Sequence, residues 1–224
     1  MSNNIFVKSF LFFIAITNLL YSSSIETNST KPLTVKEKKQ RFHDLLLPAI
    51  QEVYSILDKR YKKTKAMIDN GTNTDEIKKF IKIYSAKDKE DLLQRMKPHP
   101  KSIALAQAAM ESGWATSRFF NIANNVFGVW SIDENEPRVP ANKSRKYRQI
   151  YLKKYNKISD SIMDYYMMIA RNKAFSEFRK QKMLTDDPHK LVEKLDKYSE
   201  QGAKYSEELS KVIKYNKFNL LDKE

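Results

Sequence analysis

Apolar residues recur at steps of three and four along most of the chain, the spacing that places them on one face of a helix. The longest such run extends over residues 35–61, with Thr34 as its expected N-cap. Pro48 lies inside this run and is expected to kink or split the helix, because proline removes a backbone donor. The pattern therefore predicts a long N-terminal helical segment.

Shorter helical runs follow, each with its own start signal. Asn73 or Thr74 is expected to cap the second helix, and Ser102 a later one. Asp187 followed by Pro188 is typical of another helix start. Between about 128 and 156 the pattern changes, and the stretch RQIYLKKY has the β-branched and aromatic character of a strand or hairpin arm. The chain is thus predicted to be mainly α, with one small β insertion.

Residues 104–114, ALAQAAMESGW, predict a helix that is apolar on nearly every face and therefore central to a core. Gly113 is expected to end it, which places Glu111 in its last turn. Apolar neighbours and the negative end of the helix dipole both raise the pKa of a carboxyl group there. A glutamic acid that stays protonated near neutral pH is what a glycosidase general acid requires. The alternative is that Glu111 points into solvent or pairs with Arg118 or a nearby lysine.

Aromatic and amide side chains follow this acid: Trp114, Asn124, Asn125, Phe127 and Trp130. Sugar polymers bind to aromatic faces and to amide hydrogen-bonding groups, so these residues are candidates for substrate binding. The alternative is that the aromatic rings belong to the core and that the two asparagines form a turn.

The chain is basic, with 41 Lys and Arg residues against 27 Asp and Glu, a formal net charge of +14. Such a surface attracts polyanions such as nucleic acid, anionic lipid or a cell-wall polymer with carboxylates, although a lysine-rich surface also simply favours solubility. The absence of cysteine excludes disulfides, thiolate nucleophiles and iron–sulfur clusters. The 3 histidines are far apart in sequence, so neither a metal site nor a cofactor is expected.

The N-terminus has the pattern of a targeting signal. Lys8 precedes an apolar run over residues 10–20, and serines follow at 22–24. The run is shorter than the ~20 residues of a membrane-spanning helix and suits a secretory signal. Residues 1–24 are therefore predicted to be a signal peptide or an uncleaved membrane anchor, and residues 25–34 a polar linker. The body of the protein is expected to work outside the cytoplasm, in the periplasm or cell envelope, which argues against a nucleic-acid partner.

The stretch ALAQAAMESGWATSRFFNIANNVFGVW closely resembles the signature of the bacterial N-acetylglucosaminidases of glycoside hydrolase family 73, and within that family the Bax-type branch. The family pattern is A-x-A-x-x-E-S-x-W, then T/G-S, then N-N-x-F-G, and this chain has it in register. Three other segments are similar to helices of that branch: RFHDLLLPAIQEVYSILDKR, DSIMDYYMMIARNKAFSEFR and LDKYSEQGAKYSEELSKVIKYNK. The resemblance covers nearly all of residues 35–220.

This resemblance implies a lysozyme-like fold with a small β-lobe and hydrolysis of the β-1,4 bond after N-acetylglucosamine in peptidoglycan. It implies one domain over residues 35–224, divided into N-terminal helices (35–100), a catalytic helix and motif (101–127), a β-lobe (128–156) and C-terminal helices (157–224). Glu111 takes the place of the family's general acid, and Tyr198 that of a tyrosine across the cleft, with Tyr205 as the alternative. The implied substrate-binding residues are Trp114, Asn125, Phe127 and Gly128, and Trp130 is added as an aromatic candidate.

Many family members carry a second acidic residue in the β-lobe. Here Asp133, Glu134 and Glu136 lie in an apparent turn, and Glu136 is the preferred candidate. Otherwise the substrate's acetamido group could act as nucleophile, or Glu111 could work with a water molecule held by Tyr198. A non-catalytic peptidoglycan-binding module and a muramidase are the alternative functions.

Overall fold

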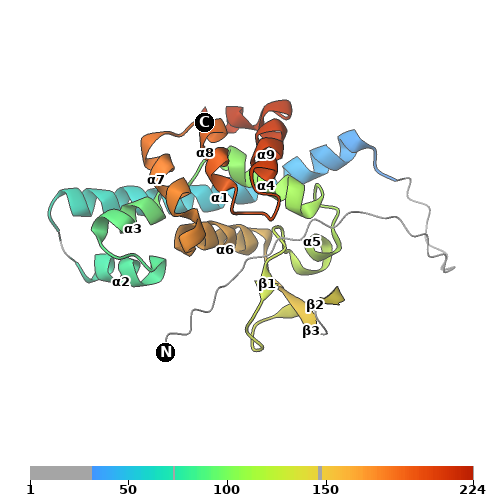
Figure 1. The fold of residues 1–224 in the computed structure, drawn as a ribbon, viewed down its shortest axis with the longest axis horizontal. Helices are drawn as coiled ribbons and strands as arrows, with labels where there is room; N and C mark the ends of the chain where they lie inside the picture. Colours follow the sequence, from blue (N-terminus) through green and yellow to red (C-terminus); the bar gives the residue numbers. More distant parts are fainter. Residues whose placement is uncertain (1–31, 73, 146–147, 224) are drawn as a thin grey trace.

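The computed structural model describes residues 32–223, apart from residues 73 and 146–147 (Figure 1). The predicted signal peptide or anchor, residues 1–24, and most of the linker predicted over residues 25–34 lie outside the described residues. Within the described part of the chain, no helix combines the length and apolar character needed to span a membrane.

The N-terminal helix α1 extends over Val35–Asp69. Thr34 caps it as predicted: its hydroxyl accepts from the backbone N–H of Glu37 at 3.3 Å, while the Glu37 carboxylate accepts from the Thr34 N–H at 2.7 Å. Pro48 does not split the helix, which continues through it. Buried residues of α1 lie on both sides of the proline, and the helix packs on α3, α4 and α6, which compensates for the lost hydrogen bond.

The predicted central helix is α4, Lys101–Ser112, which contacts α1, α8, α9 and the C-terminal 3₁₀ helix. Every residue from Lys101 to Ala109 is buried. The predicted N-cap Ser102 is wrong, because α4 already begins at Lys101, after Pro100. The carboxylate of Asp222 accepts from the backbone N–H of Ser102 at 3.0 Å and supplies the acceptor that the start of the helix needs.

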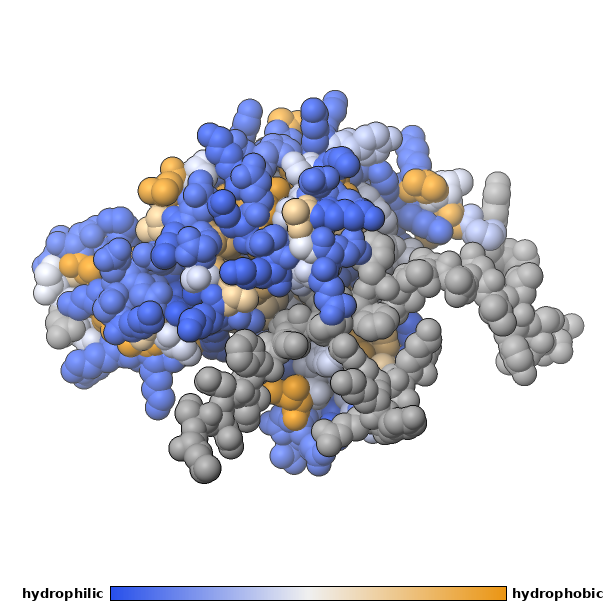
Figure 2. All heavy atoms as spheres, in the orientation of Figure 1, coloured by the Kyte–Doolittle hydropathy of each residue, from blue (hydrophilic) through white to orange (hydrophobic). Residues whose placement is uncertain are grey.

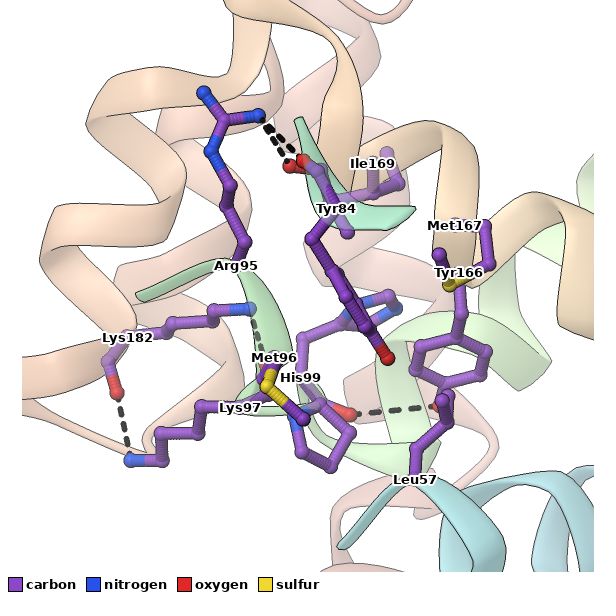
Figure 3. A pocket seen from close by; sticks show the side chains of 12 residues that line it. Leu57, Tyr84, Arg95, Met96, Lys97, His99, Tyr166, Met167, Ile169 and Lys182 are labelled. Atoms are coloured by element: carbon purple, nitrogen blue, oxygen red, sulfur yellow. Dashed lines mark hydrogen bonds between the residues drawn. The ribbon is translucent and has the colours of Figure 1, made fainter. Parts of the chain in front are cut away.

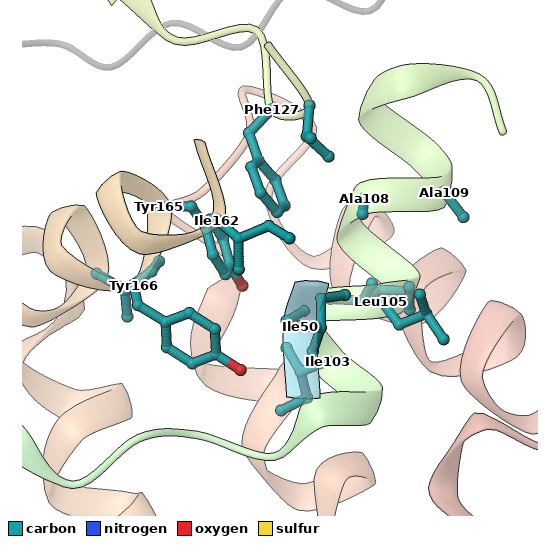
Figure 4. Packing of buried hydrophobic residues seen from close by; sticks show 14 of the residues in the cluster. Ile50, Ile103, Leu105, Ala108, Ala109, Phe127, Ile162, Tyr165 and Tyr166 are labelled. Carbon is teal, nitrogen blue, oxygen red and sulfur yellow. The ribbon is translucent and has the colours of Figure 1, made fainter. Parts of the chain in front are cut away.

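The remaining helices surround α4 and α1 (Figure 1). Thr74 caps α2 and Asp187 caps α8, both as predicted. The apolar side chains that meet at the centre include Ile50, Ile103 and Ile162 (Figure 4). The elements are α2 (Asp75–Tyr84), α3 (Lys89–Met96), α5 (Arg118–Ala123), α6 (Ile158–Arg171), η1 (Lys173–Phe175), α7 (Ser176–Leu184), α8 (Pro188–Val192), η2 (Glu193–Leu195), α9 (Ala203–Tyr215) and η3 (Phe218–Lys223).

The β insertion is a small antiparallel sheet in the order β1-β3-β2, and in Figure 1 it projects from the helical body. Its strands are β1 (Trp130–Ser131), β2 (Arg138–Arg145) and β3 (Arg148–Lys153). Leu152 lies opposite Trp130 on one side and Val139 on the other. The predicted fold class, a mainly helical lysozyme-like fold with a small β-lobe, is confirmed.

Hydrophilic side chains cover most of the face shown in Figure 2, and apolar residues are scattered among them.

Candidate active site

Glu111 is the penultimate residue of α4, which ends at Gly113 in the left-handed conformation (φ 58°), as predicted. The side chain retains partial solvent exposure, and its Oε1 accepts a hydrogen bond from the Tyr205 hydroxyl at 3.1 Å. Burial raises the pKa of Glu111 to about 7, and the hydrogen bond from Tyr205 opposes that rise. Near neutral pH this carboxyl group is therefore able to hold a proton and to give it up.

The turn after Glu111 is unusual because Gly113, Trp114 and Ala115 all have positive φ, at 58°, 60° and 60°. This conformation is costly for residues other than glycine. Ser112 holds it: its hydroxyl donates to the Ala108 carbonyl at 2.6 Å and accepts from the Ala115 N–H at 2.9 Å. The serine of the Glu-Ser-Gly-Trp motif therefore fixes the end of α4, a role that sequence reasoning missed.

Both candidate tyrosines lie beside Glu111. Tyr205, on α9, makes the hydrogen bond. Tyr198 precedes α9 and stacks on Tyr205, with ring centroids 5.4 Å apart and an interplanar angle of 19°. The Tyr198 hydroxyl is buried and has no hydrogen-bond partner in the described part of the chain. Direct contact with the acid thus belongs to Tyr205, and Tyr198 packs behind it.

A chain of buried polar side chains leads away from Glu111 into the core. Gln107 Nε2 donates to the Tyr205 hydroxyl at 2.8 Å, and the Tyr165 hydroxyl donates to Gln107 Oε1 at 2.5 Å. His99 Nε2 lies 3.0 Å from the Tyr165 hydroxyl oxygen. The sequence contains a signal for these hydrogen bonds. Gln107 is a lone polar residue in an apolar helix, and a buried polar group needs hydrogen-bond partners.

The residues after α5 connect the helices to the β-lobe. Asn125 is buried, and its amide is committed to the backbone: Nδ2 donates to the carbonyls of Val129 and Lys153 at 2.9 Å, and Oδ1 accepts from the Val129 N–H at 2.9 Å. Phe127 is fully buried and stacks on Tyr165 with centroids 4.0 Å apart (Figure 4). Both residues therefore lie beneath the surface.

The other three predicted substrate-binding residues lie nearer the surface. Gly128 has φ 65° and Trp130 lies on β1, and both are partly exposed. Trp114 is partly buried; its ring meets Phe42 edge-on at 5.1 Å, and the Lys39 ammonium lies 4.6 Å from the ring centroid. One face of this tryptophan is thus occupied by a cation from α1.

Glu136 lies at the base of the β-lobe. Its Oε2 is 3.5 Å from the Lys153 ammonium, which also pairs with Asp164 at 3.1 Å. Its Oε1 is buried and has no hydrogen-bond partner among the described residues. The contacts of Glu136 in this part of the chain lead to Lys153 and not to Glu111.

A small pocket lies elsewhere, between α3, α6 and α7 (Figure 3). It is lined by Tyr84, Arg95, His99 and Lys182, among others. Its cations bind backbone carbonyls: Arg95 Nη1 donates to the carbonyls of Ala170 and Arg171 at 3.2 and 3.0 Å. No described residue in its lining carries a carboxyl group, so it lacks the group that acid catalysis of glycoside hydrolysis needs.

No group of three or more His, Asp or Glu side chains within the described ranges is placed to hold a metal ion. The chemistry that the described residues offer at Glu111 is proton transfer from a carboxyl group, which a buried tyrosine contacts.

Comparison with known proteins places this site in a family. Residues 86–218 match the family described as Glucosaminidase: Mannosyl-glycoprotein endo-beta-N-acetylglucosaminidase. Protein bax of Escherichia coli (strain K12) is 28% identical over 121 residues, which cover 51% of this chain and 42% of that protein. The match thus spans less than half the length of that relative.

A solved structure shows the same kind of fold. The catalytic domain of the autolysin Auto from Listeria monocytogenes has a TM-score of 0.50 and 15% identity, covering 87% of this chain and 91% of that one. A peptidoglycan hydrolase from Sphingomonas sp. A1 has a TM-score of 0.45 and 22% identity, covering 57% and 85%. The family match spans more than half of the 224 residues and includes Glu111 with its helix, so the chain belongs to the glucosaminidase family of glycoside hydrolases, family 73.

Proposed function

We propose that this protein is an exported peptidoglycan hydrolase that cleaves the β-1,4 bond after N-acetylglucosamine, with Glu111 as general acid. The observation that carries the proposal is the carboxyl group of Glu111, buried enough to have a pKa of about 7 and held by Tyr205 at the end of α4. Membership of the glucosaminidase family supports the choice of bond. The net charge of +14 supports a polymer whose stem peptides carry carboxylates.

In the proposed reaction, the proton of Glu111 passes to the glycosidic oxygen as the bond from that oxygen to C1 of N-acetylglucosamine breaks. Water then supplies the hydroxyl group at C1, and its remaining proton restores Glu111. Trp130 and Gly128 are proposed to face the glycan, because both keep solvent exposure. Asn125, Phe127 and Trp114 are proposed to shape the substrate side from beneath, since each is packed or hydrogen-bonded within the protein.

Digestion of purified peptidoglycan by the full chain, followed by mass analysis of the new reducing ends, tests this function. Terminal N-acetylglucosamine is the expected product. Terminal N-acetylmuramic acid would make the protein a muramidase, and wall binding without release of fragments would make it a non-catalytic binding module.

Glu136 is proposed as the second catalytic group, the base or nucleophile. Its support is its place in the β-lobe, where Oε2 lies 3.5 Å from the Lys153 ammonium, together with an Oε1 that has no hydrogen-bond partner among the described residues. Glu136→Gln is expected to slow hydrolysis by roughly a hundredfold or more, while binding to the wall is kept. The measurement is the initial rate of reducing-end release together with pelleting on insoluble peptidoglycan.

Glu134→Gln is the matched control, because Glu134 lies in the same turn and is exposed. It is expected to leave the rate unchanged. A Glu136→Gln variant as active as the wild type would exclude Glu136 and leave the substrate's acetamido group, or water held by Tyr198, in the second role.

A further inference from the structure

We propose that His99, Tyr165 and Gln107 are positioning residues: together they form a hydrogen-bond chain of fixed direction that, through Tyr205, determines which oxygen of Glu111 carries the catalytic proton. This inference rests on the proposed role of Glu111 as general acid. It adds three residues that do not touch the acid, the farthest of which lies before α4 and lines the pocket of Figure 3.

The direction of the chain follows from the number of hydrogens that each group has to donate. The single hydroxyl hydrogen of Tyr205 goes to Glu111 Oε1, so its oxygen accepts from Gln107 Nε2. The hydroxyl hydrogen of Tyr165 goes to Gln107 Oε1, so the Tyr165 oxygen is left to accept from His99. His99 must then be the tautomer with hydrogen on Nε2, and every bond in the chain donates toward Glu111.

The state of His99 agrees with this direction. Burial lowers the pKa of His99 well below its ordinary value, and the nearby charge of Lys182 adds to the effect. A neutral imidazole has one N–H, and the chain requires that it lies on Nε2. The ring is held in place by stacking on Tyr166, with centroids 4.3 Å apart.

The consequence at Glu111 is an asymmetry between its two oxygens. Oε1 accepts the hydrogen bond at the end of the chain, so the proton is favoured on Oε2. Successive hydrogen bonds polarise one another in a low-dielectric interior, so each upstream donor strengthens the bond from Tyr205. His99, Gln107, Tyr165 and Tyr205 are each at most 1% exposed, so bulk water does not replace a lost member.

Among the described residues, the hydrogen-bond chain through Tyr205 is the main polar interaction of Glu111. Burial raises the pKa values of three nearby hydroxyls, those of Tyr165, Tyr198 and Tyr205, and the charge of Glu111 adds to each rise. From α1, Arg41 donates to the carbonyl of Ala115 at 3.3 Å and Lys39 lies over Trp114. From η3, Asp222 meets the opposite end of α4, at Ser102.

Two adjacent buried tyrosines of α6 provide a matched test. Tyr165→Phe removes one link, and Phe preserves the stacking on Phe127. Tyr166→Phe removes a hydroxyl that donates only to the His99 carbonyl, at 3.4 Å, outside the chain. The measurement is the pH dependence of peptidoglycan hydrolysis, in which activity falls as pH rises through the pKa of Glu111.

We expect Tyr165→Phe to move this alkaline limb upward by on the order of 0.3 pH unit, because the carboxylate loses stabilisation. Gln107→Met removes both the amide donor and the amide acceptor at similar side-chain length, and is expected to give a larger shift in the same direction. Tyr166→Phe is expected to give none. A downward shift of the alkaline limb, or equal shifts for Tyr165→Phe and Tyr166→Phe, would refute the proposed hydrogen-bond chain.

The tautomer of His99 gives a second readout that does not depend on activity. Nitrogen-15 NMR of the wild-type protein near neutral pH is expected to show a neutral ring with hydrogen on Nε2. Hydrogen on Nδ1 would refute the direction even if every variant failed to fold. An active Glu111→Gln variant would instead refute the proposed function, so the two failures are distinguishable.

Discussion

Glu111→Gln is expected to lower the rate of peptidoglycan hydrolysis by at least about a hundredfold, the contribution typical of a positioned general acid. Glutamine has nearly the same shape and still offers an oxygen to the Tyr205 hydroxyl, which is 3.1 Å from Oε1 in the wild type. It has no acidic proton to give to the departing sugar oxygen. The measurement is the release of reducing ends near pH 6, where the wild-type carboxyl group is mainly protonated.

The pH dependence of folding stability distinguishes a loss of catalysis in Glu111→Gln from a failure of the variant to fold. The folded pKa of Glu111 is about 7 and its ordinary value is 4.5, so the folded state holds the proton more tightly. The stability that comes from the neutral carboxyl group is complete below pH 4.5 and is lost as pH rises through about 7. Glutamine does not ionise, so the variant should match the wild type in acid and exceed it above pH 8, by on the order of 3 kcal/mol.

Glu207→Gln is the control, since Glu207 is an exposed glutamate on α9. It should retain full activity and the wild-type dependence of unfolding on pH. A Glu111→Gln variant that keeps more than about a tenth of the wild-type rate would assign the acid to another residue.

The parts of this molecule that sequence predicts well are those governed by local rules. The apolar circumference of α4, the glycine that ends it and the place of Glu111 in its last turn all follow from residues within one segment. The same holds for the caps at Thr34, Thr74 and Asp187, because each cap bonds to a backbone N–H two or three residues away. The start of α4 escaped prediction because its acceptor, Asp222, lies 120 residues further along the chain.

The surroundings of Glu111 could not be predicted for the same reason. Its hydrogen-bond donor, Tyr205, is 94 residues away, and Tyr165 is 58 residues from Gln107. Periodicity shows that a tyrosine is on the buried face of a helix, but not which buried polar group it meets. Choosing between Tyr198 and Tyr205 required the packing of α9 against α4.

Asn125 illustrates how a residue type can predict a kind of bond and still leave its partner open. Asparagine after the catalytic motif suggests an amide that binds sugar. The structure instead commits all three of its hydrogen bonds to the backbone of Val129 and Lys153, where the β-lobe joins the helices. A role in binding sugar and a role in holding the β-lobe backbone predict different consequences for the same substitution of Asn125.

Asn125→Ala is expected to lower the free energy of unfolding by roughly 2–4 kcal/mol, because it leaves backbone groups of Val129 and Lys153 without partners in a partly buried place. The loss should appear in denaturant unfolding and as faster hydrogen exchange in β1 and β3. Asn121→Ala is the control: Asn121 lies on α5 and is exposed, and it bonds the carbonyls of Thr116 and Ser117. Its effect should stay within about 0.5 kcal/mol.

Binding to insoluble peptidoglycan, measured at a temperature where the variant is folded, then decides between the two roles. If Asn125 supports the substrate side from beneath, Asn125→Ala loses stability first and keeps most of its affinity for the wall once folded. A variant of unchanged stability that no longer binds the wall would instead make Asn125 a direct sugar ligand. That result would require the amide to leave its three backbone partners when glycan binds, since a single side-chain amide has two donor hydrogens and the structure uses both.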